Sequence, residues 1–151
     1  MENSICNNHR CMASIPRIKN LLTKAREAGM LVVYSLTHTG DPSDINQQLD
    51  PSPTDPIVKS NVDKFYNTDL DSILQKNHIQ TVIITGYAAN GAVLHTVVAA
   101  AFRGYHVAVP VDGMPASTLY PEQYTAWHLL NSPGSRNQAV LTRTDLITIA
   151  K

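Results

Sequence analysis

A charge imbalance, long apolar runs and histidine clusters are all missing from this sequence of 151 residues. Lysine plus arginine and aspartate plus glutamate balance at 12 each, so no surplus of charge predicts a nucleic acid or an anionic lipid surface as partner. No apolar stretch approaches the roughly twenty residues of a transmembrane helix, and the polar start Met1–Ser4 is unlike a signal peptide. These absences favour a small-molecule partner, no membrane contact and a cytoplasmic location.

Cysteine is also scarce, with only Cys6 and Cys11, close together in a polar segment. A structural metal site needs a second ligand pair of matching spacing, and neither that pair nor an Asp-x-His pattern occurs. Neither cysteine follows a strand at the start of a helix, where a thiolate nucleophile would be stabilised. We therefore expect two free thiols in a reducing compartment, no metal and no cofactor.

Hydrophobic residues make up 43% and charged residues 16% of the chain, which is typical of a folded globular protein. The length suffices for one domain with a sizeable core and is short for two. We therefore expect a single domain over residues 1–151.

Short apolar runs alternate with helical patterns along the chain. Strands are expected at 30–36, 57–58, 81–85, 106–111 and 139–142, because these runs are short and rich in valine and isoleucine. Helices are expected from the cap Ser14 to Gly29 and at 68–77, 90–103 and 121–131, with a last helical turn near the end. The proline-rich segment 39–56 is expected to be a loop with a functional or gating role.

Strands that alternate with helices predict a parallel sheet covered by helices on both faces. We therefore predict a Rossmann-like, doubly wound α/β fold with three αβα layers. Such folds bind ligands at the carboxyl ends of their strands, where His38 follows the strand that ends at Leu36.

Three motifs carry a resemblance to the isochorismatase-like cysteine hydrolases. The segment from Lys59 to Leu70, with Phe65 six residues after the lysine, resembles the family's strand-end lysine and the phenylalanine that follows it. The segment 85–114 resembles the family's nucleophile turn and its next strand, and 142–144 resembles the closing strand. These motifs occur in the family's order over nearly the whole chain.

The resemblance implies a catalytic trio of aspartate, lysine and cysteine. In the family the aspartate acts as base, the lysine orients the substrate, and the thiolate attacks an amide while backbone N–H groups hold the oxyanion. Lys59 matches the lysine, whereas Ala92 stands at the position of the cysteine. Gly91 and Ala92 would supply the oxyanion donors at a helix start, and a cis peptide bond is implied at Tyr87–Ala88.

The family's aspartate ends a first strand that this sequence does not contain. That strand ends in Asp-Met-Gln-Asn or similar, whereas this sequence starts Met1-Glu2-Asn3. The first strand of such a sheet is central, so its absence would leave two neighbours with unpaired edges and an open apolar slot. We expect either that the protein starts upstream or that a partner segment fills the slot.

Further residues are candidates for the small-molecule site. Tyr87, Ala88, Phe65 and His38 could contact a substrate, although core packing is the alternative for the aromatic residues and a loop position for His38. Asp112 ends a strand on the ligand side, and the resemblance implies a structural role for it.

Three functions stay open. The first is hydrolysis of a vinyl ether such as isochorismate, because family members of this kind carry a small residue in place of cysteine, although Asn90 departs from their usual histidine. The second is an amidase of the nicotinamidase or carbamoylsarcosine type, inactive or impaired because Ala92 replaces cysteine. The third is a non-catalytic pseudohydrolase that binds a small ligand or serves in assembly. The resemblance also implies a homo-oligomer, with the helix 90–103 and the C-terminal part of the chain as candidate contacts.

Overall fold

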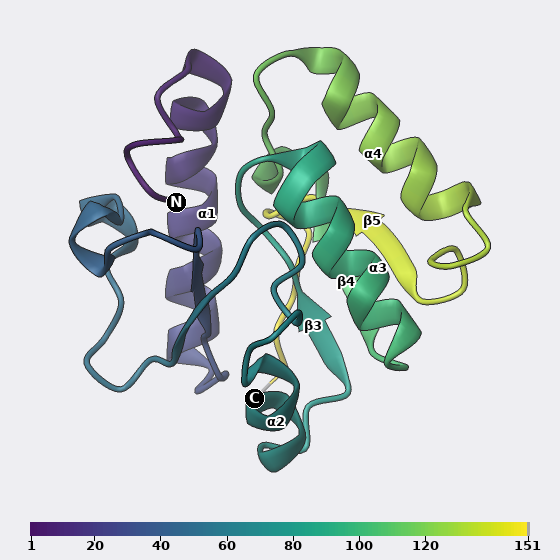
Figure 1. The fold of residues 1–151 in the computed structure, drawn as a ribbon, viewed down its shortest axis with the longest axis horizontal. Helices are drawn as coiled ribbons and strands as arrows, with labels where there is room; N and C mark the ends of the chain where they lie inside the picture. Colours follow the sequence, from purple (N-terminus) through teal and green to yellow (C-terminus); the bar gives the residue numbers. More distant parts are fainter. Residues whose placement is uncertain (151) are drawn as a thin grey trace.

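The computed structural model describes residues 1–150, which form two parallel β-sheets and four α-helices (Figure 1). The strands are β1 (Tyr34–Leu36), β2 (Ile57–Lys59), β3 (Thr81–Ile83), β4 (His106–Pro110) and β5 (Ala139–Thr142). The helices are α1 (His9–Glu27), α2 (Leu70–Lys76), α3 (Leu94–Phe102) and α4 (Leu119–Asn131). One sheet has the order β1-β2 and the other the order β3-β4-β5, with every pair parallel. The predicted α/β architecture with parallel strands is confirmed.

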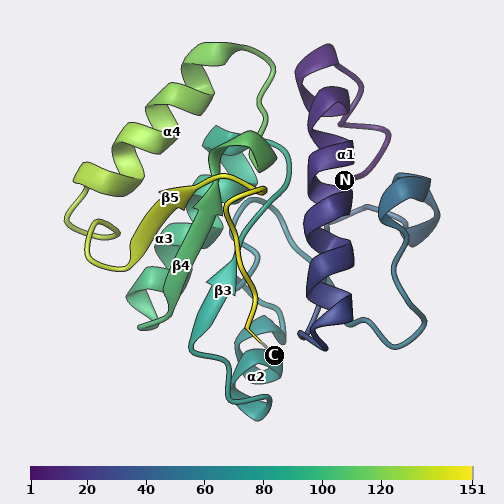
Figure 2. The ribbon, with the colours of Figure 1, turned by 180° about the vertical axis from the view of Figure 1, so that it is seen from behind.

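Two apolar clusters form the core, and the larger one also includes Val58 of β2. Ile15 and Ile18 of α1 pack with Leu36 of β1 in the smaller cluster. The larger cluster includes Val97 of α3 and Val107 of β4, both fully buried. Figures 1 and 2, which view the molecule from opposite sides, show α3 and α4 over one face of the sheet β3-β4-β5. None of the helices within residues 1–150 is long and apolar enough to cross a membrane.

The helix α1 begins at His9, so the prediction that Ser14 caps it was wrong. The side chain of Asn8 is the cap, because its oxygen accepts a hydrogen bond from the N–H of Cys11 at 3.0 Å. Ser14 lies within the helix, where its hydroxyl donates to the carbonyl of Cys11 at 2.7 Å. The prediction failed because Pro16, typical of a first helical turn, lies inside this helix.

Cys6 and Cys11 form a disulfide, so the prediction of two free thiols was wrong. Their side chains are 2% and 0% exposed, and the bond ties the N-terminal segment to the first turns of α1. The prediction assumed a reducing compartment, in which disulfides are rare, and the sequence itself contains no evidence for that compartment.

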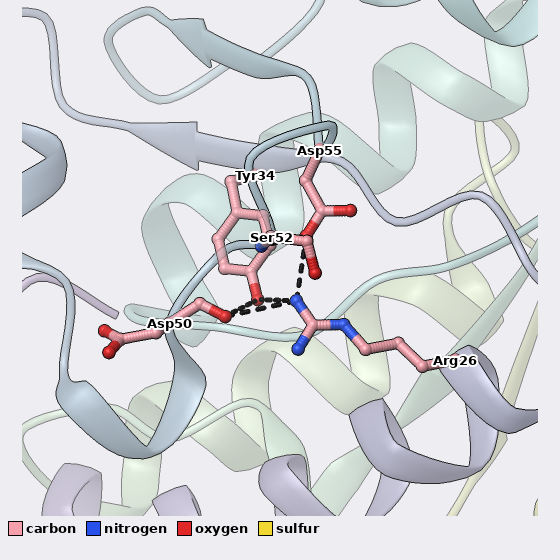
Figure 3. Close-up of polar contacts among 5 residues, drawn as sticks. All are labelled: Arg26, Tyr34, Asp50, Ser52 and Asp55. Atoms are coloured by element: carbon pink, nitrogen blue, oxygen red, sulfur yellow. Dashed lines mark hydrogen bonds and ion pairs between the residues drawn. The ribbon is translucent and has the colours of Figure 1, made fainter.

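The predicted proline-rich loop is fixed to α1 by a polar cluster (Figure 3). The guanidinium of Arg26 donates to the carbonyl of Asp50 at 3.1 Å and to the carboxylate of Asp55 at 2.8 Å. It also donates to the hydroxyl of Tyr34 at 3.2 Å, and burial is the main cause that raises the pKa of this tyrosine. These contacts hold the end of the loop that leads into β2, and a gating role for the rest stays a prediction.

Candidate functional site

The segment after β2 lies against the start of α3. A Cβ atom placed on Gly91 would lie 3.9 Å from a methyl group of Val62. The hydroxyl of Thr96 accepts from the N–H of Lys64 and donates to the carbonyl of Val62, both at 3.2 Å. The fold therefore brings the loop that begins at Lys59 to the turn that contains the predicted nucleophile position.

The turn between β3 and α3 contains the cis peptide bond that the resemblance implied at Tyr87–Ala88, and this prediction is confirmed. The chain then forms one π-helical turn, Ala89–Val93, that continues into α3. Ala92 lies in this turn and is half-buried. The N–H of Gly91 donates to the carbonyl of Ala88 at 3.0 Å, so this donor is engaged within the turn rather than free for an oxyanion.

Lys59 is the last residue of β2 and its side chain is exposed. It forms no ion pair with any carboxylate of residues 1–150. The role of this ammonium group in ligand binding stays a prediction.

Lys64, which the sequence reasoning did not single out, is buried with its side-chain nitrogen among carbonyls. Its Nζ donates to the carbonyl oxygens of Leu36 at 2.9 Å, Ser60 at 3.1 Å and Asn61 at 2.7 Å. Burial lowers its pKa, and the charge of Glu2 acts in the opposite direction. Lys64 thus joins the end of β1 to the loop after β2. No sequence pattern predicts this role of Lys64, because a sequence does not show which backbone carbonyls will accept its hydrogen bonds.

Glu2, also missed, closes the end of β1. It is 5% exposed, and its two carboxylate oxygens accept from the N–H and the hydroxyl of Thr37, both at 2.8 Å. The side-chain amide of Asn8 donates to the hydroxyl of Tyr87 at 3.4 Å. The N-terminal segment therefore lies across the carboxyl ends of both β1 and β3.

Phe65 and His38 differ in environment. Phe65 is 5% exposed, its ring stacks on that of Tyr105 with centroids 6.0 Å apart, and the guanidinium of Arg103 lies 4.7 Å from its centroid. These are the contacts of a core residue. His38 is exposed in the turn after β1, and its contact with a ligand stays a prediction.

Two cavities lie along α1, away from the predicted site. One of about 250 Å³ separates α1 from residues 111–115, and one of about 390 Å³ separates it from residues 143–145. Asp112 borders both, and its carboxylate accepts from the N–H and the hydroxyl of Thr144 at 2.8 Å each, which confirms its structural role. Neither cavity is lined by Lys59 or Ala92.

Comparisons with known proteins identify the relatives of this chain. The family model described as the isochorismatase domain matches residues 1–145. The chain belongs to this isochorismatase domain family. A secreted isochorismatase effector of Verticillium dahliae is 31% identical over 113 residues, which are 68% of this chain and 60% of that protein. The chain therefore spans less than two thirds of the length of this curated relative.

Solved structures share the fold of this isochorismatase-domain chain. An isochorismatase-like hydrolase from Alkaliphilus metalliredigens matches with a TM-score of 0.84 and 22% identity, covering 96% of this chain and 90% of that one. An N-carbamoylsarcosine amidase from Thermoplasma acidophilum matches with a TM-score of 0.79 and 24% identity, covering 91% of this chain and 86% of that one. A nicotinamidase from Bacillus subtilis has a TM-score of 0.77 and 17% identity, with coverages of 89% and 87%. These likenesses confirm the Rossmann-like α/β fold.

Proposed function

We propose that this isochorismatase-family chain hydrolyses a small molecule at the ends of β2 and β3 by chemistry that uses no cysteine nucleophile. The observation that carries this proposal is Ala92 in the turn before α3. Its methyl group cannot attack a carbonyl, and both cysteines of the chain are joined in a disulfide at the start of α1. Hydrolysis of a vinyl ether needs a proton donor and water but no thiol. The name of the Verticillium relative, an isochorismatase, supports this substrate class.

Lys59 is the proposed binding residue for the charged part of the substrate. Its ammonium group is exposed and unpaired with carboxylates among residues 1–150, and isochorismate carries carboxylates. The N-terminus of α3, next to the loop that follows Lys59, adds the positive end of a helix dipole. The proposed site therefore favours an anionic small molecule over a neutral amide.

A turnover assay tests the proposal. The purified chain is incubated separately with isochorismate, nicotinamide and N-carbamoylsarcosine, and the products are measured by mass spectrometry. We expect consumption of isochorismate that falls at least tenfold in Lys59→Met, and no hydrolysis of either amide. Hydrolysis of an amide by the unmodified chain would contradict the proposal, since it would require a nucleophile that the site lacks.

Binding without turnover is the second candidate. The side chain of Glu2 is buried and both of its carboxyl oxygens accept hydrogen bonds from Thr37, so it is engaged in a structural contact rather than exposed to a ligand. A ligand that binds only the folded state raises the melting temperature by mass action, whether or not it is consumed. A melting shift with isochorismate, without product, would therefore favour the binding protein over the hydrolase.

Ala92→Cys would place the only free thiol of the protein in the turn before α3. A helix start stabilises a thiolate, so we expect its alkylation by iodoacetamide to rise with a midpoint below the ordinary cysteine pKa of about 8.5. Asn90→Cys is the matched control, because Asn90 is exposed in the same turn. The rate of labelling is measured by intact mass at a series of pH values, which gives the pH midpoint of each variant. Identical profiles for the two variants would show that the turn does not favour an anion at residue 92.

We also propose that the chain works in an oxidising compartment rather than in the predicted cytoplasm. The buried disulfide supports this location, since such bonds persist mainly outside the cytosol. The relative from Verticillium dahliae is named as secreted. When the protein is denatured straight from its native source in the presence of an alkylating reagent and without a reductant, neither Cys6 nor Cys11 should be labelled, and labelling of both would contradict the proposal.

A homo-oligomer remains a proposal based on the resemblance. Besides the helix 90–103, the helix α4 is a candidate contact, because Tyr120 and Trp127 on it are 73% and 64% exposed. Sedimentation equilibrium measures the mass in solution, and a monomer at every concentration would contradict the proposal.

A further inference from the structure

We propose that His95 is a positioning residue for the anionic ligand of the proposed site. Its imidazole holds the peptide group between Gly91 and Ala92, so that the N–H of Ala92 points at the ligand. The inference rests on the proposed function, because it takes an anion to bind at the start of α3. It adds to that function a side chain that fixes the direction of one backbone donor.

His95 is the second residue of α3, and its side chain is exposed. Its Nδ1 lies 2.8 Å from the carbonyl oxygen of Gly91, one helical turn earlier. A carbonyl oxygen only accepts hydrogen bonds, so Nδ1 carries the proton and is the donor. The neutral ring is therefore the Nδ1–H tautomer, and its orientation is fixed although the side chain is exposed.

The bond to the carbonyl of Gly91 also sets the direction of the next N–H group. The peptide bond between Gly91 and Ala92 is trans and planar, so its C=O and its N–H point in opposite directions. His95 binds the carbonyl from the side of α3. The N–H of Ala92 is therefore directed away from α3, toward the N-terminal end of the turn, where a helix favours an anion.

The π-helical turn leaves this peptide group only partly fixed by the backbone. The carbonyl of Ala88 accepts from two N–H groups, those of Gly91 at 3.0 Å and Val93 at 3.3 Å. The N–H of Leu94 is shared between the carbonyls of Ala89 and Gly91. In a regular α-helix each carbonyl has an N–H of its own, four residues further on. The imidazole thus adds a bond at a carbonyl that has only a share of a backbone donor.

The residue after His95 holds the other side of the proposed site. The hydroxyl of Thr96 bonds to the loop that follows Lys59, at the carbonyl of Val62. A Cβ placed on Gly91 would have one methyl group of Val62, at 3.9 Å, as its only neighbour within 4 Å among residues 1–150. Neighbouring side chains therefore leave room beside this peptide group. His95 fixes the turn, and Thr96 fixes the loop against it.

The tautomer gives a first test that needs no ligand. NMR chemical shifts of the ring nitrogens distinguish the two neutral tautomers of histidine. We expect Nδ1–H at His95, and at His106, which is exposed at the start of β4, the Nε2–H form that imidazole prefers in water. The Nε2–H form at His95 would show that the bond to Gly91 is not made, and would overturn the proposal.

A matched pair of variants tests the effect on binding. Asparagine keeps an N–H donor two bonds from Cβ, as Nδ1 is, whereas leucine has the same shape without a donor. The dissociation constant of isochorismate is obtained from melting temperatures at increasing ligand concentration. We expect it to rise at least tenfold in His95→Leu, because a hydrogen bond to a charged group is lost. His95→Asn and the control His106→Leu should stay within threefold of the natural chain. Equal weakening in His95→Leu and His95→Asn would overturn the proposal.

The thiol of Ala92→Cys gives a readout that does not depend on isochorismate. The same two substitutions of His95 are added to this variant, and the pH midpoint of alkylation by iodoacetamide is measured. We expect His95→Leu to raise the midpoint and His95→Asn to leave it unchanged, since only leucine releases the peptide group before the thiolate. Equal rises would mean that the imidazole acts by its charge, and no rise would mean that it does not orient the turn. Either result would contradict the proposal.

These tests separate the inference from the proposed function. If the natural chain neither binds nor consumes isochorismate, the proposed substrate is wrong, whereas the tautomer and the thiol midpoints still decide the role of His95. If isochorismate binds and His95→Leu binds it equally well, the proposed function stands and the positioning role is wrong. A His95→Leu chain that does not fold would leave the tautomer and the comparison of His95→Asn with the natural chain as the deciding measurements.

Discussion

Replacing Phe65 with alanine is expected to lower the free energy of unfolding by about 3–5 kcal/mol, as for other buried phenylalanines. Phe65 is 5% exposed and lies in the larger apolar cluster. The substitution removes its stacking on Tyr105 and the contact with the guanidinium of Arg103, and leaves a cavity that the surrounding helices fill only in part. Urea denaturation at neutral pH measures the change.

The control for this experiment is Phe102→Ala. Phe102 is 75% exposed at the end of α3, so its loss should change stability by no more than about 0.5 kcal/mol. The comparison separates the two roles considered for Phe65. If Phe65→Ala keeps its stability but weakens ligand binding, Phe65 is a substrate-binding residue, the first of the two roles considered for it, and the core interpretation is wrong.

Local patterns and motif order predicted much of the fold and part of the site. The parallel strands followed from short runs of β-branched residues, and the cis bond at Tyr87–Ala88 followed from the resemblance. The resemblance likewise implied a structural role for Asp112, whose carboxylate accepts two hydrogen bonds from Thr144. These features depend on residues that are close in sequence or on a motif with a fixed geometry.

The contacts that could not be predicted join distant residues or depend on the environment. The carbonyl of Leu36 binds Lys64, and the carboxylate of Glu2 binds Thr37, although no periodicity links either pair. The disulfide between Cys6 and Cys11 depends on the redox state of the compartment as well as on the spacing of the cysteines. Sequence patterns report the local backbone, whereas these interactions arise only after the elements have packed.

The second large effect is expected at Lys64. Lys64→Met should cost about 2–3 kcal/mol, because three backbone carbonyls lose a charged donor inside the protein. The cost stays moderate since methionine fills much of the same volume and removes the unfavourable burial of the ammonium group. Lys59→Met is the matched control, and it should change stability by no more than about 0.5 kcal/mol, because Lys59 is exposed.

The pH dependence of this difference checks its origin. Burial lowers the pKa of Lys64 in the folded protein, so the unfolded chain holds the proton more tightly up to its ordinary pKa of 10.5. At pH values between the folded and the unfolded pKa of Lys64, the free energy of unfolding of the natural chain therefore rises with pH. Lys64→Met lacks the titrating group, so its free energy of unfolding does not rise for this reason. The difference in the free energy of unfolding between the natural chain and Lys64→Met should be larger at pH 9.5 than at pH 7. A difference that becomes smaller at pH 9.5 would mean that a partner charge stabilises Lys64 as a cation. The hydrogen bonds to the three carbonyls would then not be its main stabilising interaction.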